Sequence, residues 1–353
     1  MLSLSYLKNL IIKRWSALFL LLLLTFFSIT AKGFLDLENF QDIFLASVTI
    51  LTLGIGQTLV IITGGIDLSV GFSMGFSAVV MATVVRNLSL AGVSPVYSIL
   101  IGMGLALAVG AIIGLINGYL VAFLRVPSFI ATLGMYGIAH GLGLITTGGF
   151  PVANLPDVVC SLGNRYLFYY LPKEFFTFFR MPENVLHTKL RAVVRILPLV
   201  AIVIFAIAIF MIIILSKTQF GKHTYAIGCS MDVARRVGIR VKTHLLKIYC
   251  ICSIFAALGG MVYTFRYGSG NVEAGAGNML ISIAAVVIGG ASLYGGTGNI
   301  QGTIVGALII GTLQTGLVIL GVQPFYQYIA IGVVIIIGVL IDQLTERKLG
   351  EVE

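Results

Sequence analysis

The sequence predicts an all-α integral membrane protein, and two observations carry this prediction. The chain of 353 residues is 58% hydrophobic and only 10% charged, with a mean hydropathy of +1.06, whereas about a quarter of the residues in a soluble globular protein are charged. Its apolar residues also come in runs of about 18–25, which is the length that a helix needs to cross a bilayer. We therefore expect a single transmembrane domain over residues 1–353.

About ten transmembrane spans are expected from these runs, with broken helices near the centre of the bundle. The basic stretch before the first span resembles a secretory signal, but it has no small-residue cleavage site and further spans follow. We therefore interpret the first span as a retained anchor. The expected spans are 15–31, 43–63, 70–85, 97–123, 127–146, 196–215, 245–265, 279–294, 301–320 and 326–342.

The segment from Lys217 to Lys247 sets the expected orientation. It holds seven Lys or Arg residues and one acidic residue, Asp232, and basic residues accumulate in loops on the cytoplasmic side. With ten spans, both chain termini then lie in the cytoplasm as well. The long segment 147–195 falls on the periplasmic side, and its six basic residues do not oppose this, because long loops do not follow the charge rule.

The same segment contains the aromatic stretch YLFYYLPKEFFTFF, from Tyr166 to Phe179. Aromatic rings favour the boundary between lipid and water, so one interpretation is an interfacial insert that lies along the membrane surface. The other interpretation is a lipid-facing surface loop with no further role.

The stretch TGGIDLSVG holds the only acidic residue between Ile43 and Pro156, Asp67. An acidic residue at the centre of a membrane helix costs about 2.5–3.5 kcal/mol on insertion scales, so Asp67 needs a specific role. The glycines before it permit a break in the helix, and a carboxylate there can accept hydrogen bonds from the next turn. We expect Asp67 to cap a discontinuous helix, and contact with a polar solute is compatible with that role.

A weak internal repeat links this stretch to a later one. VIITGGIDLSVG (60–71) and AVVIGGASLYGG (285–296) share an apolar lead, a Gly-Gly pair, a Leu three residues later and a Gly three further on. Transporters are often built from repeats with irregular helices near the substrate path, although chance is the other explanation in a chain with 42 glycines. Two further polar residues of the spans have a specific expectation: Asn117 is expected to hydrogen-bond between helices, and His140 is expected to be a satisfied buried histidine rather than a ligand.

Motifs for nucleotide binding and for metal chemistry are absent from the sequence. There is no G-x-x-x-x-G-K-[ST] loop to hold ATP phosphates and no H-E-x-x-H pair for zinc. The four cysteines form no CxxC pair, so neither a metal site nor a cofactor bound by this chain is expected. Ionisable residues are scarce in the spans, which argues against an ion-coupled carrier, so a partner must supply the energy. Cytoplasmic loops account for the net charge of +9, and no nucleic-acid partner is expected.

Four stretches of the chain occur in the same order as in a known protein family. They are TGGIDLSVG (63–71), NGYLVAFLRVPSFIATLGMYGIAHGLGLITTGG (117–149), FGKHTYAIGCSMDVARRVGI (220–239) and IAAVVIGGASLYGGTGNIQGTIVGALIIG (283–311). Together they closely resemble the ribose-type permeases of bacterial ABC importers, a family related to branched-chain amino acid permeases. The resemblance covers nearly the whole chain except the N-terminal tail and about 150–195.

The resemblance implies a permease subunit with the helix bundle of type II-like ABC importers. Two such subunits, identical or not, would form the pore among the lipids of the bacterial inner membrane. A separate ATPase would bind ATP and Mg²⁺ on the cytoplasmic side, and a periplasmic binding protein would deliver a sugar or related small polar solute. The chain itself would be no enzyme, and transport would proceed by alternating access.

The resemblance also assigns residues. The cytoplasmic segment 216–244 would dock on the ATPase, although a simple run of positive charge is the other interpretation of it. Its candidate docking residues are Gly221, Ala226, Gly228, Ala234, Arg235, Arg236 and Gly238. The candidates for the translocation path or its gate are Gly64, Gly65, Asp67, Ser69, Asn117, Gly289 and Gly290.

The chain departs from the family pattern at several positions. Met279 and Ile281 replace an acidic pair, His140 replaces a common Arg and Ile331 replaces a frequent Lys. These departures imply either a different solute or a second, non-identical permease that supplies the charges. The alternatives are therefore a permease for a nucleoside or a branched-chain amino acid and, from another class, a secondary carrier that works without ATP.

Overall fold

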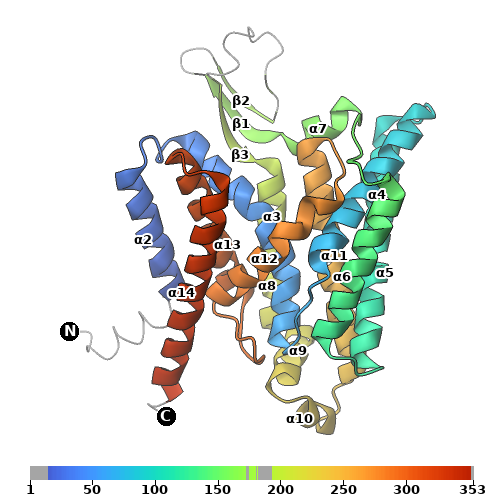
Figure 1. Ribbon diagram of the computed structural model, residues 1–353, viewed down its shortest axis with the longest axis vertical. Helices are drawn as coiled ribbons and strands as arrows, with labels where there is room; N and C mark the ends of the chain where they lie inside the picture. Colours follow the sequence, from blue (N-terminus) through green and yellow to red (C-terminus); the bar gives the residue numbers. More distant parts are fainter. Residues whose placement is uncertain (1–14, 172–174, 180, 182–192, 351–353) are drawn as a thin grey trace.

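The computed structural model describes residues 15–171, 175–179, 181 and 193–350, and it is a bundle of long helices with a small sheet at one end (Figure 1). Seven helices are long and apolar enough to cross a membrane: α3 (Leu37–Ile62), α4 (Val70–Leu90), α5 (Pro95–Ala122), α6 (Ser128–Thr147), α8 (Leu199–Lys217), α11 (Val241–Tyr267) and α13 (Ile300–Ile319).

Three further apolar helical stretches are shorter, and they lie where the sequence predicts the remaining spans. They are α2 (Trp15–Thr30), the pair η2 (Val272–Gly275) and α12 (Ala276–Ile288), and the first part of α14 (Pro324–Gly350). A helical membrane protein is therefore confirmed, whereas the count of ten spans stays a prediction.

Several predicted span bounds differ clearly from the helix bounds. The helix expected from 43 starts at Leu37, and those expected to end at 85 and 342 continue to Leu90 and Gly350. The span expected at 279–294 ends at Ile288, because residues 289–299 form turns. Prolines mark the starts of two other helices, since their fixed φ suits a first helical turn. Pro95 opens α5 and Pro127 directly precedes α6.

The helices run up and down between two ends of the molecule (Figure 1). α9 (Gln219–Cys229) and α10 (Met231–Arg236) lie at the lower end, toward which α2 begins and α14 ends, whereas α7 (Asp157–Gly163) and the sheet lie at the upper end. The basic segment 217–247 and both ends of the described chain thus lie at the same end of the molecule. An even number of membrane crossings would place the two chain ends on one side in this way.

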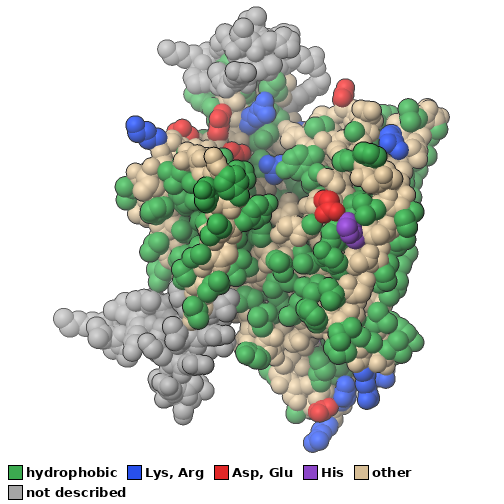
Figure 2. Space-filling model, in the orientation of Figure 1, with side chains coloured by type: hydrophobic (Ala, Val, Ile, Leu, Met, Phe, Trp, Pro, Cys, Tyr) green, Lys and Arg blue, Asp and Glu red, His purple; other side chains and the backbone are tan. Residues whose placement is uncertain are grey.

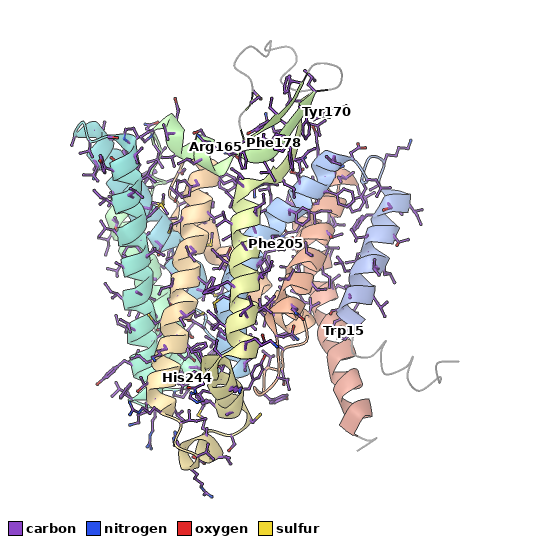
Figure 3. The ribbon with its side chains drawn as sticks, turned by 180° about the vertical axis from the view of Figure 1, so that it is seen from behind. Trp15, Arg165, Tyr170, Phe178, Phe205 and His244 are labelled. Carbon is purple, nitrogen blue, oxygen red and sulfur yellow. The ribbon has the colours of Figure 1, made fainter. Side chains whose placement is uncertain are left out.

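The described residues of the aromatic stretch form two strands, which the sequence analysis did not predict, whereas the position of the stretch relative to the membrane surface stays a prediction. β1 (Tyr166–Leu171) pairs antiparallel with β2 (Phe175–Phe178) and with β3 (Val194–Pro198). Aromatic residues favour such cross-strand pairs, and Phe168 faces Phe178 on one side and Ile196 on the other. In Figure 3, Tyr170 and Phe178 lie at the upper end of the molecule, whereas His244 lies near the lower end. The stretch therefore projects from the upper end of the bundle.

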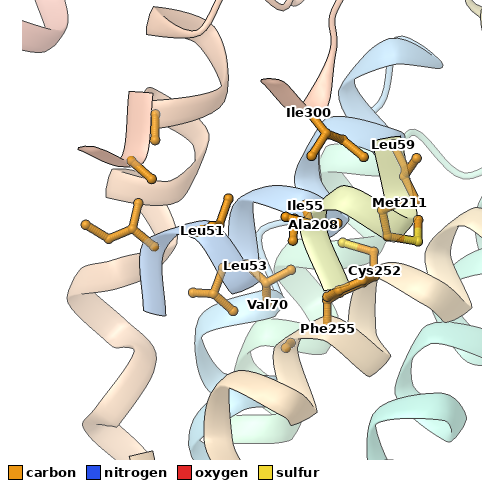
Figure 4. Packing of buried hydrophobic residues seen from close by; sticks show 14 of the residues in the cluster. Leu51, Leu53, Ile55, Leu59, Val70, Ala208, Met211, Cys252, Phe255 and Ile300 are labelled. Atoms are coloured by element: carbon orange, nitrogen blue, oxygen red, sulfur yellow. The ribbon is translucent and has the colours of Figure 1, made fainter. Parts of the chain in front are cut away.

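The core is built around α3, which is mostly apolar and is buried over most of its length. A helix of this kind belongs in the interior, whereas a helix at the boundary exposes one face. α5, α6 and α8 expose many apolar side chains. On the face drawn in Figure 2, hydrophobic side chains lie between charged groups at the two ends. The close packing around α3 includes Leu51, Leu53, Ile55 and Leu59 of α3, Val70, Ala208, Met211, Cys252, Phe255 and Ile300 (Figure 4).

Candidate functional site

The helix break lies between α3 and α4, where the sequence predicts it. Gly64 has a left-handed φ of +78°, which glycine adopts without steric cost. Its N–H donates to the Ile61 carbonyl at 2.8 Å, and the N–H of Gly65 donates to the Val60 carbonyl at 3.1 Å. This pair of bonds is the Schellman motif, which satisfies the last carbonyls of a helix. The Gly-Gly pair therefore ends α3 inside the bundle.

Asp67 is fully buried between the two helices. Its Oδ1 accepts hydrogen bonds from the Ser69 backbone N–H at 2.9 Å and from the Ser69 hydroxyl at 2.6 Å. The hydrogen bond expected of Asp67 is therefore present, since its carboxylate accepts from an N–H at the start of the next helix. The N-cap residue of α4 itself is Ser69, two residues later than expected, and its side chain makes no capping bond.

Two other helices contribute to this buried polar cluster. Asn117 of α5 donates from Nδ2 to the Ser69 hydroxyl at 2.9 Å, as expected for a bond between helices. Gln57 of α3 donates from Nε2 to the Asp67 backbone carbonyl, and both side chains are fully buried. Within the described residues, three oxygens of the cluster have no hydrogen-bond partner, namely Gln57 Oε1, Asp67 Oδ2 and Asn117 Oδ1.

Hydroxyl groups of α6 hold the backbone of the break. The Ile66 N–H donates to Ser128 Oγ at 3.3 Å, and the Leu68 N–H donates to Thr132 Oγ1 at 3.1 Å. Sequence reasoning missed Gln57, Ser128 and Thr132. A signal existed for the last two, because residues four apart share one helix face, but nothing in the sequence says which face meets the break.

A second interior turn follows α12, and the predicted repeat is recognisable in it with a shifted register. Gly290 has a φ of +90°; its N–H donates to Val287 at 2.8 Å, and the N–H of Ala291 donates to Val286 at 3.2 Å. This is the same Schellman motif as at Gly64. The structure therefore equates Gly64 with Gly290, whereas the sequence comparison had equated Gly64 with Gly289.

Helix α9, at the lower end of the molecule, contacts both turns. The Gly296 N–H donates to the Ile62 carbonyl at 2.8 Å and so ties the second turn to the end of α3. Gly228 of α9 packs against this junction so closely that a β-carbon on it would overlap the Ile62 carbonyl oxygen and crowd the Gly296 nitrogen. Figure 1 shows α9 directly below the lower end of α3. A displacement of α9 must therefore shift both turns.

Tyr225 makes a further contact from α9 to the second turn. Its hydroxyl donates to the Gly298 carbonyl at 2.6 Å, and burial raises the pKa of this phenol, so the hydroxyl keeps its proton. One residue, Thr218, separates α9 from α8.

We expect Tyr225→Phe to lower transport by about 2–10-fold, the loss of one neutral hydrogen bond, and the uptake rate of the assembled transporter measures it. Tyr97→Phe is the control, because the Tyr97 side chain is 65% exposed. An unchanged uptake rate of Tyr225→Phe would show that this contact is not part of the transport cycle.

The predicted docking residues divide into two groups. Gly221 packs against the backbone of Leu215, and Ala234 is buried; with Gly228 they fix the shape of the segment. Arg235, Arg236 and Gly238 are exposed, Ala226 is half-buried, and Arg235 pairs with Asp232 at 3.0 Å. The side chain of Ser230 accepts from the N–H of Val233 and caps α10.

No metal centre or nucleophile accompanies these elements in the part of the chain that the structure describes. Its residues include no group of three His, Cys, Asp or Glu side chains placed to hold a metal ion. The run GFSMG at 71–75 has the spacing of a nucleophile turn, but it lies inside α4 with Ser73 fully buried.

Comparison with known proteins identifies the family. A family model described as the permease component of branched-chain amino acid transport systems matches residues 39–339. The chain belongs to this permease family. Its relatives include the galactose/methyl galactoside import permease of Haemophilus influenzae, 32% identical over 97% of both chains, and the ribose import permease of Bacillus subtilis, 36% identical over 92% of this chain and 90% of the relative. The D-allose transport system permease of Escherichia coli is 34% identical over 91% of this chain and 88% of the relative. No solved structure matches the chain.

These matches confirm the resemblance drawn from the four sequence stretches. The permease is a transport component and not an enzyme, and it is a multi-pass membrane protein.

Proposed function

We propose that this permease is the membrane subunit of an ATP-driven importer for a sugar or a related small polar solute. The observation that supports this most is its likeness, over nearly the whole chain, to import permeases named for galactose, ribose and allose. A separate ATPase supplies energy from ATP and Mg²⁺, and a periplasmic binding protein delivers the solute. The basic segment at the lower end supports a cytoplasmic position of that end in the bacterial inner membrane.

Exposed apolar side chains on α10 support ATPase docking there. Val233 and Val237 are 57% and 69% exposed, beside the exposed Arg235 and Arg236. Apolar groups that stand free at the polar end of a membrane protein are typical of a protein interface, and Arg is enriched in such interfaces.

We expect Val233→Asp to remove most of the ATPase that purifies with the permease, because docking would bury an unpaired charge. The measurement is the ratio of the two subunits after purification in mild detergent. Val96→Asp is the matched control, since Val96 is 59% exposed at the start of α5, toward the opposite end. A full complement of ATPase on Val233→Asp would place the docking surface elsewhere.

The buried cluster supports a gate role more than contact with the solute. Asp67, Ser69 and Asn117 are fully buried, whereas α9 contacts the turns on either side of them. When the ATPase subunits close, α9 would move both turns, and the helices would tilt around the path. Gly64, Gly65, Gly289 and Gly290 would serve as the pivots of this movement.

Purification from native membranes tests the proposal first, through the proteins that accompany the permease. We expect an ATPase with a phosphate-binding loop and a solute-binding protein to purify with the permease. We also expect the complex in proteoliposomes to take up ribose, galactose or allose when ATP is supplied. A second, similar permease in the complex would indicate a heterodimer. Uptake that survives without ATP but stops with the ion gradient would favour a secondary carrier, and uptake of a nucleoside or a branched-chain amino acid instead would replace the sugar.

A further inference from the structure

A partly exposed ion pair lies on the outer face of the bundle, apart from the buried cluster. His140 Nε2 of α6 and Glu273 Oε1 of η2 are 2.8 Å apart, and the two side chains are 32% and 56% exposed. The expectation of a buried histidine at this position is therefore wrong. The sequence gives no hint of the pair, because its members are 133 residues apart.

The pair lies in the part of the bundle that a membrane would surround. His140 is within the long apolar helix α6, which ends at Thr147, about 10 Å further along the helix axis at 1.5 Å per residue. In Figure 2 the acidic and histidine patch lies among hydrophobic side chains, between the charged groups at the two ends. A carboxylate exposed to hydrocarbon is strongly unfavourable. This face must therefore border water or another protein rather than lipid.

The surface around the pair is open. Gly137 precedes His140 by one turn of α6, and Gly277 follows Glu273 by about one turn. Neither glycine has any atom within 4 Å of the place where a side chain would begin, and the same holds for Gly134 and Gly141. The positions beside the pair are thus unobstructed on the surface of the bundle, so a small molecule that reaches this face can approach both side chains.

Both members of the pair are held in fixed positions. The His140 ring stacks on Phe72 with centroids 4.1 Å apart, and Phe72 is itself fixed by Tyr136 at 4.5 Å. The N–H of Glu273 donates to Asn271 Oδ1 at 3.0 Å, which anchors the start of η2. A carboxylate only accepts hydrogen bonds, whereas an imidazole N–H donates, and a hydroxyl group can do both.

We propose that His140 and Glu273 form a hydroxyl-binding subsite in the wall of the translocation path, for a polyhydroxylated solute. A solute hydroxyl donates to the Glu273 carboxylate, while a second solute hydroxyl bonds the remaining ring nitrogen of His140, Nδ1, because Nε2 is taken by Glu273. The hydroxyl donates to Nδ1 when the ring is neutral and accepts from it when the ring is protonated. The subsite rests on the proposed import function, because it assigns the open face of α6 to the path of the imported solute.

Thiol labelling tests whether this face borders water. Gly137→Cys is made in a chain in which the exposed Cys160 and Cys229 are replaced by serine, and a charged, membrane-impermeant thiol reagent is applied. We expect rapid labelling that slows when ribose, galactose or allose is added. Ile209→Cys is the control, because Ile209 is 57% exposed on the apolar helix α8 and is expected to face lipid. Labelling no faster than at Ile209→Cys would overturn the proposal, and so would labelling that none of the three sugars slows.

Uptake by charge-neutral variants tests the subsite itself. Glu273→Gln is expected to lower sugar uptake by about 10–100-fold, the effect of losing a hydrogen bond to a charged group, while the ATPase still purifies with the permease. Glu38→Gln is the control, because Glu38 is an exposed carboxylate in the first turn of α3. Wild-type uptake by Glu273→Gln would overturn the subsite. If the wild-type permease bound no ATPase, that result would contradict the proposed ATP-driven import function instead. The labelling result would still decide whether the exposed face of α6 borders water.

Discussion

Replacing Gly228 with alanine is expected to abolish ATP-driven uptake while the helix bundle stays assembled. The new β-carbon would overlap the Ile62 carbonyl oxygen and crowd the Gly296 nitrogen. These are backbone atoms, which cannot rotate away as a side chain can, so α9 itself would have to move. Overpacking of this kind costs about 1–3 kcal/mol. That is enough to separate α9 from the two turns that it contacts.

The measurement for Gly228→Ala is sugar uptake into proteoliposomes, followed together with ATP hydrolysis. We expect hydrolysis to continue without import, because the substitution leaves the proposed docking surface on α10 unchanged while a movement of the ATPase would no longer reach the turns. Gly104→Ala is the control, since a β-carbon there meets open space. Import by Gly228→Ala at the wild-type rate would show that the contact between α9 and Ile62 does not transmit the movement.

Removing the Asp67 side chain is expected to have the second large effect, on both stability and transport. In Asp67→Ala the Ser69 N–H and hydroxyl lose their acceptor inside a buried cluster. Each buried group that is left without a partner costs about 1–3 kcal/mol. Asp67→Asn keeps an acceptor oxygen at the same place, so its effect should be clearly smaller.

Thermal unfolding in detergent and sugar uptake measure this prediction. The expected order of melting temperature and of uptake is wild type, then Asp67→Asn, then Asp67→Ala. Asp157→Ala is the control, because Asp157 is an exposed acid in the first turn of α7. If Asp67→Ala matched the wild type in both measurements, Asp67 would have no structural or gating role.

The helices could be predicted from the sequence because hydrophobic length is a local property. The break at Gly64 was predictable for the same reason: a Gly-Gly pair followed by an isolated Asp67 is visible within a few residues. The sheet was not predicted, because β3 (Val194–Pro198) lies far along the chain from β1 and directly precedes an apolar helix. Its last three residues, 196–198, were therefore assigned to the start of that span, and the first two to the preceding segment.

The candidate site was predictable only in part. The bond between Asn117 and Ser69 fits the general behaviour of a polar residue in a membrane helix. The contact between Gly228 and Ile62 depends on the approach of two backbone segments more than 160 residues apart in the sequence. Such a contact cannot be predicted from one glycine in a chain that has 42. The partner of His140 was missed because Glu273 lies outside the predicted spans.

The junctions at the two ends of α8 have a consequence for signalling across the membrane. β3 passes into α8 with no intervening residue, and α8 passes into α9 through Thr218 alone. The sheet and α9 are therefore joined to the two ends of α8 with at most one residue between elements, which leaves no long linker to absorb a displacement. A protein that binds the sheet and displaces β3 would thus be expected to displace α8 and, through Thr218, α9.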